Sequence, residues 1–230
     1  MPETLILPRP PRAVVFDMDG LLLDTEVIYR AAHTAAAGEL GHAMTHALYA
    51  TLVGMPRETA DHLLQAAFGP GLVLADYYAS FDRHFETLCR DGMPLRPGVE
   101  ALLAVLDEAG LPRAVATSTE RSRARRHLEE AGILHRFDAV VTRSDVSQGK
   151  PHPETFLRAA EALAVAPSAC LALEDSHNGV RAASAAGMMT VMVPDLLPAT
   201  EETRRLCVAE CTSLFAVAEA LSFRAGANSG

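Results

Sequence analysis

The chain has 230 residues, of which 49% are hydrophobic, and it carries a formal net charge of −9. This length and apolar content can bury a substantial core, either as one large domain or as a core with a small insertion. The acidic balance argues against a general binder of nucleic acid or of anionic membranes, because their phosphates attract basic surfaces.

The N-terminal residues 1–11 contain Glu3 and several prolines, not a basic segment followed by a long apolar run, so no signal peptide is expected. No run along the chain approaches the roughly 18 to 20 apolar residues that cross a bilayer. The four cysteines form no CxxC pair and no zinc-like spacing, which is typical of free thiols in a reducing compartment. We therefore expect a cytoplasmic protein that does not span a membrane.

The first predicted strand is the apolar run Ala13-Val14-Val15, and Phe16-Asp17-Met18-Asp19-Gly20 follows it directly. Two carboxylates at this spacing, at the mouth of a strand, form a compact site for a hard divalent cation. Mg²⁺ prefers oxygen ligands and is usually held by one or two carboxylates together with a substrate phosphate. A glycine at the fourth position does not fit the calcium loop of an EF-hand, which requires glycine at the sixth. The segment therefore indicates phosphoryl chemistry.

Residues 24–93 contain no clear β-rich run and are rich in helix formers, with glycine breaks between them. We predict a small helical insertion, a cap, flanked by a core made of residues 1–23 and 94–230. Because the insertion leaves after the first strand and returns near Pro94, it would act as a lid on two hinges. The alternative is an ordinary crossover made of several helices. The histidines of this segment share no metal-ligand spacing.

After residue 95 the chain alternates between helices and short apolar strands. Helices are predicted over residues 99–109, 121–131, 154–163 and 176–186, with strands over residues 114–116, 137–141, 170–173 and 189–193, the last of the sheet. Glycine just past a helix commonly ends it, and Ser176 is a suitable N-cap. This alternation predicts an α/β fold with a mostly parallel sheet covered on both faces. The arginine-rich segment 121–126 is interpreted as a solvated helix face, paired with Glu129 and Glu130.

Polar side chains follow several of these strands at the edge where ligands bind in such folds. They are Asp17, Asp19, Thr117, Ser118, Glu174 and Asp175. Lys150 lies in a loop between them, and it is the one lysine among twenty Lys and Arg residues. A compact ammonium is a familiar partner of phosphate, so we interpret Lys150 as functional. Four separate segments are therefore expected to converge on one site.

In order along the chain, the motifs are Asp17-Met18-Asp19-Gly20 with Leu23-Asp24-Thr25-Glu26, Thr117-Ser118, Gly149-Lys150-Pro151-His152-Pro153, and Leu173-Glu174-Asp175-Ser176 with the residues up to Val180. This set resembles the haloacid dehalogenase superfamily, in its phosphatase and β-phosphoglucomutase-like branch with a helical cap. The resemblance extends from about residue 14 to residue 194. It implies a Rossmann-like, doubly wound parallel core with the cap inserted after the first strand.

The resemblance also implies a role for each matching residue. Asp17 would attack phosphorus and form an aspartyl-phosphate, and Asp19 would act as general acid and then general base. Thr117 and Ser118 would bind phosphoryl oxygens, and Lys150 would neutralise their charge. Mg²⁺ would be held by Asp17, by the backbone carbonyl of Asp19 and by Asp175, with Glu174 assisting through a water molecule. Gly20, Glu26 and Arg57 are candidates for the substrate and phosphate site.

These features predict a magnesium-dependent phosphatase acting on a small phosphorylated metabolite such as a sugar, polyol or nucleotide phosphate, with no nucleic-acid or membrane partner. The protein is expected to be a monomer or a weak homodimer. One alternative is a phosphosugar mutase, because Gly54-Met55-Pro56-Arg57 resembles a cap segment of β-phosphoglucomutase; against it, Tyr29 stands where those mutases carry histidine. A second alternative is a receiver-type signalling module with a phosphorylated aspartate. The cap and Asp19 argue against that module.

Overall fold

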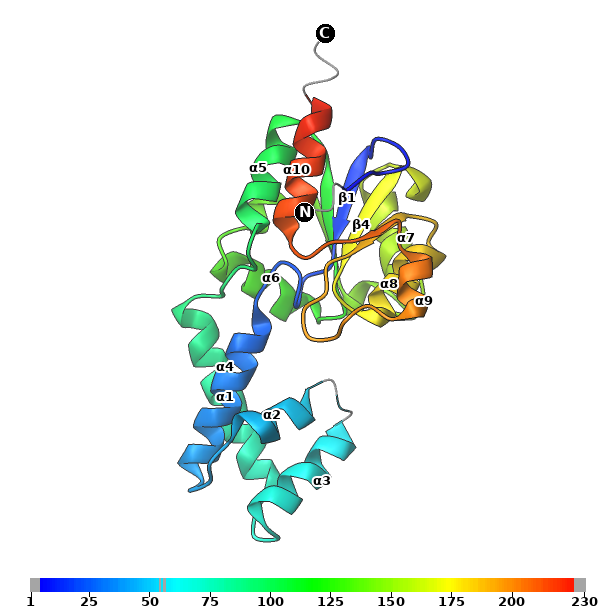
Figure 1. The fold of residues 1–230 in the computed structure, drawn as a ribbon. Helices are drawn as coiled ribbons and strands as arrows, with labels where there is room; N and C mark the ends of the chain where they lie inside the picture. The colour runs from blue at the N-terminus through cyan, green and yellow to red at the C-terminus, as the bar shows by residue number, and fades with distance from the viewer. Residues whose placement is uncertain (1–4, 54, 56, 226–230) are drawn as a thin grey trace. The chain divides into compact units, whose positions relative to one another are not determined.

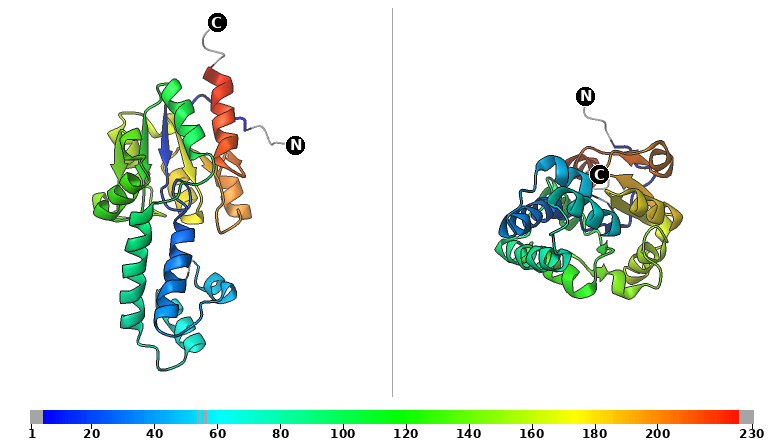
Figure 2. Two further views of the ribbon diagram at one scale, coloured as in Figure 1. Left: turned by 90° about the vertical axis from the view of Figure 1, so that its left-hand side faces the viewer. Right: turned by 90° about the horizontal axis from the view of Figure 1, so that it is seen from below.

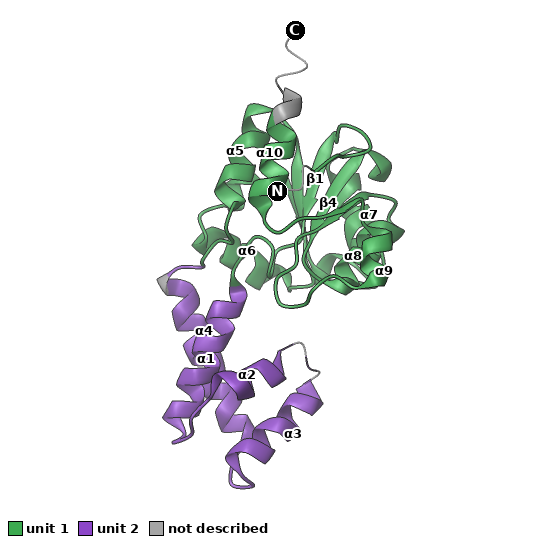
Figure 3. Cartoon of the chain, in the orientation of Figure 1, with its two compact units in different colours: residues 1–24, 94–230 green, residues 25–93 purple. Residues whose placement is uncertain are grey.

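The computed structural model describes residues 5–53, 55 and 57–225. The chain divides into two compact units (Figure 3). Unit 1 comprises residues 1–24 and 94–230, and unit 2 comprises residues 25–93. Within the described part of the chain, no helix has the length and apolar character that a membrane crossing requires.

The centre of unit 1 is a parallel sheet of six strands in the order β3-β2-β1-β4-β5-β6, which confirms the predicted α/β class (Figure 1). The strands are β1 (Ala13–Phe16), β2 (Arg113–Ala116), β3 (Ala139–Val141), β4 (Cys170–Glu174), β5 (Met189–Met192) and β6 (Ala209–Glu210). The strand order reverses between β1 and β4, which are hydrogen-bonded neighbours. In doubly wound sheets ligands bind beyond the carboxyl ends of the strands at such a reversal.

Helices cover both faces of this sheet. They are α5 (Val99–Glu108), α6 (Arg121–Glu130), α7 (Glu154–Ala162), α8 (His177–Ala185), α9 (Glu201–Leu206) and α10 (Leu214–Ala225). Helices α7 and α8 lie on one side of the sheet and α5 and α10 on the other (Figures 1 and 2). Alternate residues of β1, such as Ala13 and Val15, pack under α7 and α8 around Phe156. Because both faces are covered, most residues of the central strands are apolar on either face, and β1 is apolar throughout.

The helices of unit 1 end close to the predicted positions. Helices α5, α6 and α8 are each followed within two residues by a glycine with positive φ, namely Gly110, Gly132 and Gly187. Ser176 caps α8, because its hydroxyl accepts a hydrogen bond from Gly179 N at 3.1 Å. Propensity and capping signals are local, so they could be identified from the sequence.

Two strand predictions need correction. Strand β3 begins at Ala139 and not at Phe137, because the short helix η1 (Leu134–Arg136) precedes it and Phe137 closes that helix. Met189–Met192 is not the last strand, since β6 follows and pairs with β5. Strand β6 has two residues, Ala209 and Glu210, so it offers no apolar run that would reveal it. The pairing with its neighbour defines this strand.

Unit 2 is helical throughout its described residues. Its helices are α1 (Thr25–Glu39), α2 (His46–Leu52), α3 (Arg57–Phe68) and α4 (Leu74–Asp91). Helices α1 and α4 pack along each other (Figure 3). Aromatic rings fill this contact, with Tyr29 4.8 Å from Phe85 and His33 4.4 Å from Phe81 between ring centroids. The small unit therefore has its own apolar core.

Candidate active site

The carboxyl ends of β1, β2 and β4 border one cavity of about 430 Å³ in unit 1. Six residues predicted for the site line it: Asp17, Asp19, Thr117, Ser118, Lys150 and Asp175. Its remaining wall consists of Ser176, His177, Asn178, Arg181 and Leu197. Segments that are far apart in the sequence thus meet at the reversal of the strand order, as the topology requires.

Lys150 lies at the buried end of the cavity, between two carboxylates. Its ammonium donates to Asp17 Oδ1 and, at 2.5 Å, to Glu174 Oε1. The Lys150 side chain is 5% exposed and Glu174 is fully buried. The other Glu174 oxygen accepts hydrogen bonds from the backbone N and the hydroxyl of Ser176, each at 3.0 Å. The Lys150 ammonium and both oxygens of Glu174 are thus paired, as buried charges require. Glu174 therefore anchors Lys150.

The carboxyl groups of Asp17, Glu174 and Asp175 lie close together, with the single ammonium of Lys150 beside them. Burial raises the pKa of Asp17 to about 8, against the attraction of Lys150. Burial and the charges of Asp17 and Glu174 raise the pKa of Asp175 to about 9. Oxygen atoms of Asp17, Glu174 and Asp175 lie within 4.8 Å of one another. Clustered carboxyl oxygens whose pKa values are raised by burial and mutual repulsion fit a hard divalent cation such as Mg²⁺, which would favour their ionised forms.

Asp19 stands apart from this cluster and is held by threonine hydroxyls. Its Oδ2 accepts a hydrogen bond from Thr119 Oγ1 at 2.8 Å and a longer one from Thr117 Oγ1 at 3.5 Å. Burial raises the pKa of Asp19, while the bond from Thr119 opposes that rise. Thr119 was not among the predicted site residues. A signal was present in the sequence, because Thr119 directly follows Thr117 and Ser118 at the carboxyl end of β2.

Gly20 occupies a position that only glycine fits. Its φ is +87°, in the left-handed region, and a Cβ there would overlap the Asp175 carboxylate. The same Cβ would lie 3.3 Å from Asp195 Oδ2. Gly20 thus brings the backbone of the turn after β1 close to two carboxylates, which is consistent with a backbone role and not a ligand role.

Two further candidates, Glu26 and Arg57, belong to unit 2. The Tyr49 hydroxyl is hydrogen-bonded to Glu26. The Arg57 guanidinium is 3.2 Å from Asp61 and lies over the ring of Tyr78, with its Cζ 3.0 Å from the ring centroid. Both side chains therefore have partners inside unit 2. Of the segment that resembles β-phosphoglucomutase, Gly54 and Pro56 lie outside the described residues.

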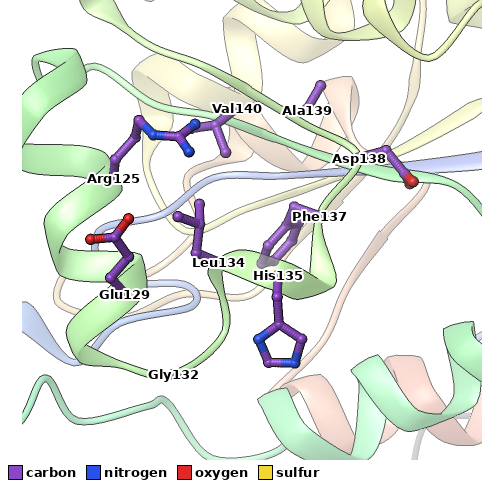
Figure 4. A pocket seen from close by; sticks show the side chains of 9 residues that line it. All are labelled: Arg125, Glu129, Gly132, Leu134, His135, Phe137, Asp138, Ala139 and Val140. Carbon is purple, nitrogen blue, oxygen red and sulfur yellow. The ribbon is translucent and has the colours of Figure 1, made fainter.

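A second cavity of unit 1, of about 550 Å³, lies beside α6, η1 and β3 (Figure 4). Leu134 and Phe137 form part of its wall, together with the charged Arg125 and Glu129 of α6. It contains none of the predicted site residues and no acid cluster. Of these two cavities, only the one at the strand ends holds predicted site residues.

Carboxylates, a buried lysine and hydroxyls at the carboxyl edge of a doubly wound sheet define an α/β enzyme with a site suited to a phosphate group and a cation. Comparison with known proteins identifies the family. Residues 11–187 match the model of the haloacid dehalogenase-like hydrolases, and this match covers more than half of the chain. The chain belongs to that family, as its motifs predicted.

Individual relatives agree with this assignment. The protein CbbY of Rhodobacter capsulatus is 34% identical over 195 residues, which cover 80% of this chain and 85% of that protein. A phosphorylated carbohydrates phosphatase of Thermotoga maritima is 32% identical over 176 residues, covering 76% of this chain and 82% of the relative. The solved structure of a family hydrolase from Deinococcus radiodurans R1, with bound phosphate and sodium, matches with a TM-score of 0.78 and 26% identity, over 94% of this chain and 97% of that one.

Proposed function

We propose that the protein is a Mg²⁺-dependent phosphatase that hydrolyses a small phosphomonoester through a covalent phosphate on Asp17. The observation that carries the proposal is the single cavity in which Asp17, Asp19 and Lys150 meet. The family and the phosphatase among the relatives support the same reaction class. A sugar, polyol or nucleotide phosphate is the expected substrate class.

The acid cluster supports the metal requirement. Asp17 and Asp175 would hold Mg²⁺, with the backbone carbonyl of Asp19 as a further ligand. Both Glu174 oxygens already accept hydrogen bonds, from Lys150 and Ser176, so Glu174 would act by fixing Lys150. When bound there, the ion would offset the charge of the phosphoryl oxygens beside the carboxylates.

The chain's own groups account for the two steps. In the first, an Asp17 oxygen attacks phosphorus, the bond to the leaving oxygen breaks, and Asp19 gives that oxygen a proton. Burial favours the protonated form of Asp19, as this step requires. In the second step Asp19 takes a proton from water, the resulting hydroxide attacks phosphorus, and the bond to Asp17 breaks. Lys150 and Thr117 stabilise the charge on the phosphoryl oxygens.

The test is phosphate release from para-nitrophenyl phosphate with Mg²⁺, combined with rapid acid quenching of labelled substrate. We expect many turnovers per protein and a quenched adduct on Asp17. Asp17→Asn should abolish both, whereas Asp82→Asn, on an exposed acid of α4, should change neither. Steady turnover without any captured adduct would refute the mechanism. Release of at most one equivalent would favour the receiver-type alternative.

The mutase alternative has a separate readout. A panel of phosphorylated sugars should be scored for free phosphate and for isomerised product in the same reactions. In unit 2 the Arg57 guanidinium already pairs with Asp61 and stacks on Tyr78, so it is not held ready for a second phosphate. We therefore expect free phosphate as the product. Isomer formation without net hydrolysis would overturn this expectation.

A further inference from the structure

Arg96 joins two segments that border the candidate active site. Its Nη1 is 2.8 Å from Asp195 Oδ1 and 4.0 Å from Asp24 Oδ1. The Asp195 side chain is 10% exposed, and those of Arg96 and Asp24 are 24% exposed. Ion pairs that are shielded to this degree are screened less than pairs on the open surface. The contact between Arg96 and Asp195 is therefore suited to fix geometry.

The backbone of Arg96 is bonded to the turn that follows β1. Arg96 N donates to Leu22 O at 3.0 Å, and Leu23 and Leu95 form an antiparallel bridge. The turn closes on itself where Gly20 N donates to Leu23 O at 2.9 Å. Arg96 is thus attached through its main chain to the turn that carries the second acid of the acidic pair.

The side chain of Arg96 pairs with a carboxylate that lies against the same turn. Asp195 follows β5, and its carboxylate approaches Gly20, as does that of Asp175 after β4. Both carboxylates therefore lie on the side of Gly20 where a side chain would otherwise point. Burial and the charge of Asp24 raise the pKa of Asp195, so a positive charge is needed to keep its carboxylate ionised and in place. The guanidinium of Arg96 supplies it.

We propose that Arg96 is a positioning residue for phosphoryl transfer, which holds the Asp195 loop against the Gly20 turn and so sets Asp19 relative to Asp175. The inference rests on the proposed function for its kinetic readout. The side chain of Arg96 pairs with Asp195 and Asp24, and neither of these residues lines the cavity. Its effect on the reaction is indirect, through the two segments that it joins.

The experiment compares Arg96→Gln, Asp195→Asn and the double variant. A misplacement of about 1 Å can cost up to about a hundredfold in rate, so we expect each single variant to lower kcat by about tenfold, with KM within about twofold. The double variant should lose no more than either single one, because both remove the same contact. Arg96→Lys should recover part of the loss. Arg204→Gln removes an exposed pair with Glu210, away from the cavity, and is the matched control.

A second readout does not depend on turnover. Mg²⁺ with inorganic phosphate should raise the melting temperature of the wild type more than that of Arg96→Gln. If no substrate is hydrolysed but the melting-temperature shift is still larger in the wild type than in Arg96→Gln, the proposed function is wrong, whereas the role of Arg96 in positioning the site remains supported. Wild-type kcat and an undiminished melting shift in Arg96→Gln would overturn the inference. Losses that multiply in the double variant would also overturn it, because the two residues would then act independently.

Discussion

Gly179 offers a sharp test of how Glu174 holds Lys150. It lies in the first turn of α8, and a Cβ at this position would overlap the carboxylate of Glu174. Glu174 cannot simply swing aside, because it is fully buried and its oxygens accept bonds from Lys150 and Ser176. Gly179→Ala should therefore break this anchor.

The change in the free energy of unfolding of Gly179→Ala is the balance between a lost ion pair and a gain in helix propensity. A hydrogen bond to a charged group contributes about 1.5–3 kcal/mol, and breaking a buried ion pair costs about 3–5 kcal/mol. Alanine in place of glycine in a helix returns about 1 kcal/mol. We expect a net destabilisation of about 2–4 kcal/mol. For a chain of this size, that lowers the melting temperature by about 5–15 °C. Turnover should fall as well, because Lys150 loses one of its two partners.

Thermal unfolding followed by circular dichroism, together with phosphate release from para-nitrophenyl phosphate, measures both effects. Gly38→Ala is the matched control, since Gly38 lies in helix α1 and a Cβ there would meet no atom within 4 Å. It should raise stability by about 0.5–1 kcal/mol and leave kcat unchanged. If Gly179→Ala behaved like Gly38→Ala in both measurements, the anchoring role of Glu174 would be wrong.

Three other predictions concern the lysine, the metal and pH. Lys150→Arg should reduce kcat by about a hundredfold or more, because the wider guanidinium does not fit the space of the Lys150 ammonium, whose side chain is only 5% exposed. Unchanged kinetics would show that the reaction does not depend on the lysine. Removing Mg²⁺ with EDTA should abolish turnover, and Mg²⁺ at about a hundred times its Kd should stabilise the protein by about 2.7 kcal/mol, whereas an unaltered melting curve would contradict a cation site. Burial and the nearby Arg57 lower the pKa of His33 from 6.5 to about 4, so stability should fall by up to about 3 kcal/mol as pH drops through this window. His33→Phe should remove that loss in urea titrations at pH 4 to 7, and an equal slope in both proteins would exclude the histidine as its source.

The sign of the pH effect follows from which state binds the proton. His33 is held neutral in the folded protein, where its ring contacts Phe81 and its Nδ1 is 2.7 Å from the Tyr77 hydroxyl. The unfolded chain takes up a proton below pH 6.5, and the folded chain does so only near pH 4. Between these values the unfolded state binds more protons, so acidification favours unfolding.

Features with a local cause could be predicted from the sequence. The strands β1, β2, β4 and β5, the glycine-terminated helices and the Ser176 cap depend on neighbouring residues, and they lie close to where they were expected. The convergence of Asp17, Thr117, Lys150 and Asp175 follows from parallel topology, because the carboxyl ends of the strands share one edge.

Features that depend on distant partners could not be predicted. The contact of Arg96 with Asp195 joins residues about a hundred positions apart, and no spacing rule connects them. The place of Glu174 between Lys150 and Ser176 emerges only once the loops are folded together, and its assistance to the metal through water stays a prediction. The same holds for β6, which exists through its pairing with β5.

The scarcity of lysine gives a practical means of probing the protein. Acylating reagents that target side-chain amines have one possible residue in these 230, and it is shielded inside the cavity by Asp17 and Glu174. Slow acetylation by acetic anhydride would therefore report on the opening of that ion pair. The rate of acetylation of Lys150, measured by mass spectrometry, would show how often local opening exposes this ion pair to solvent.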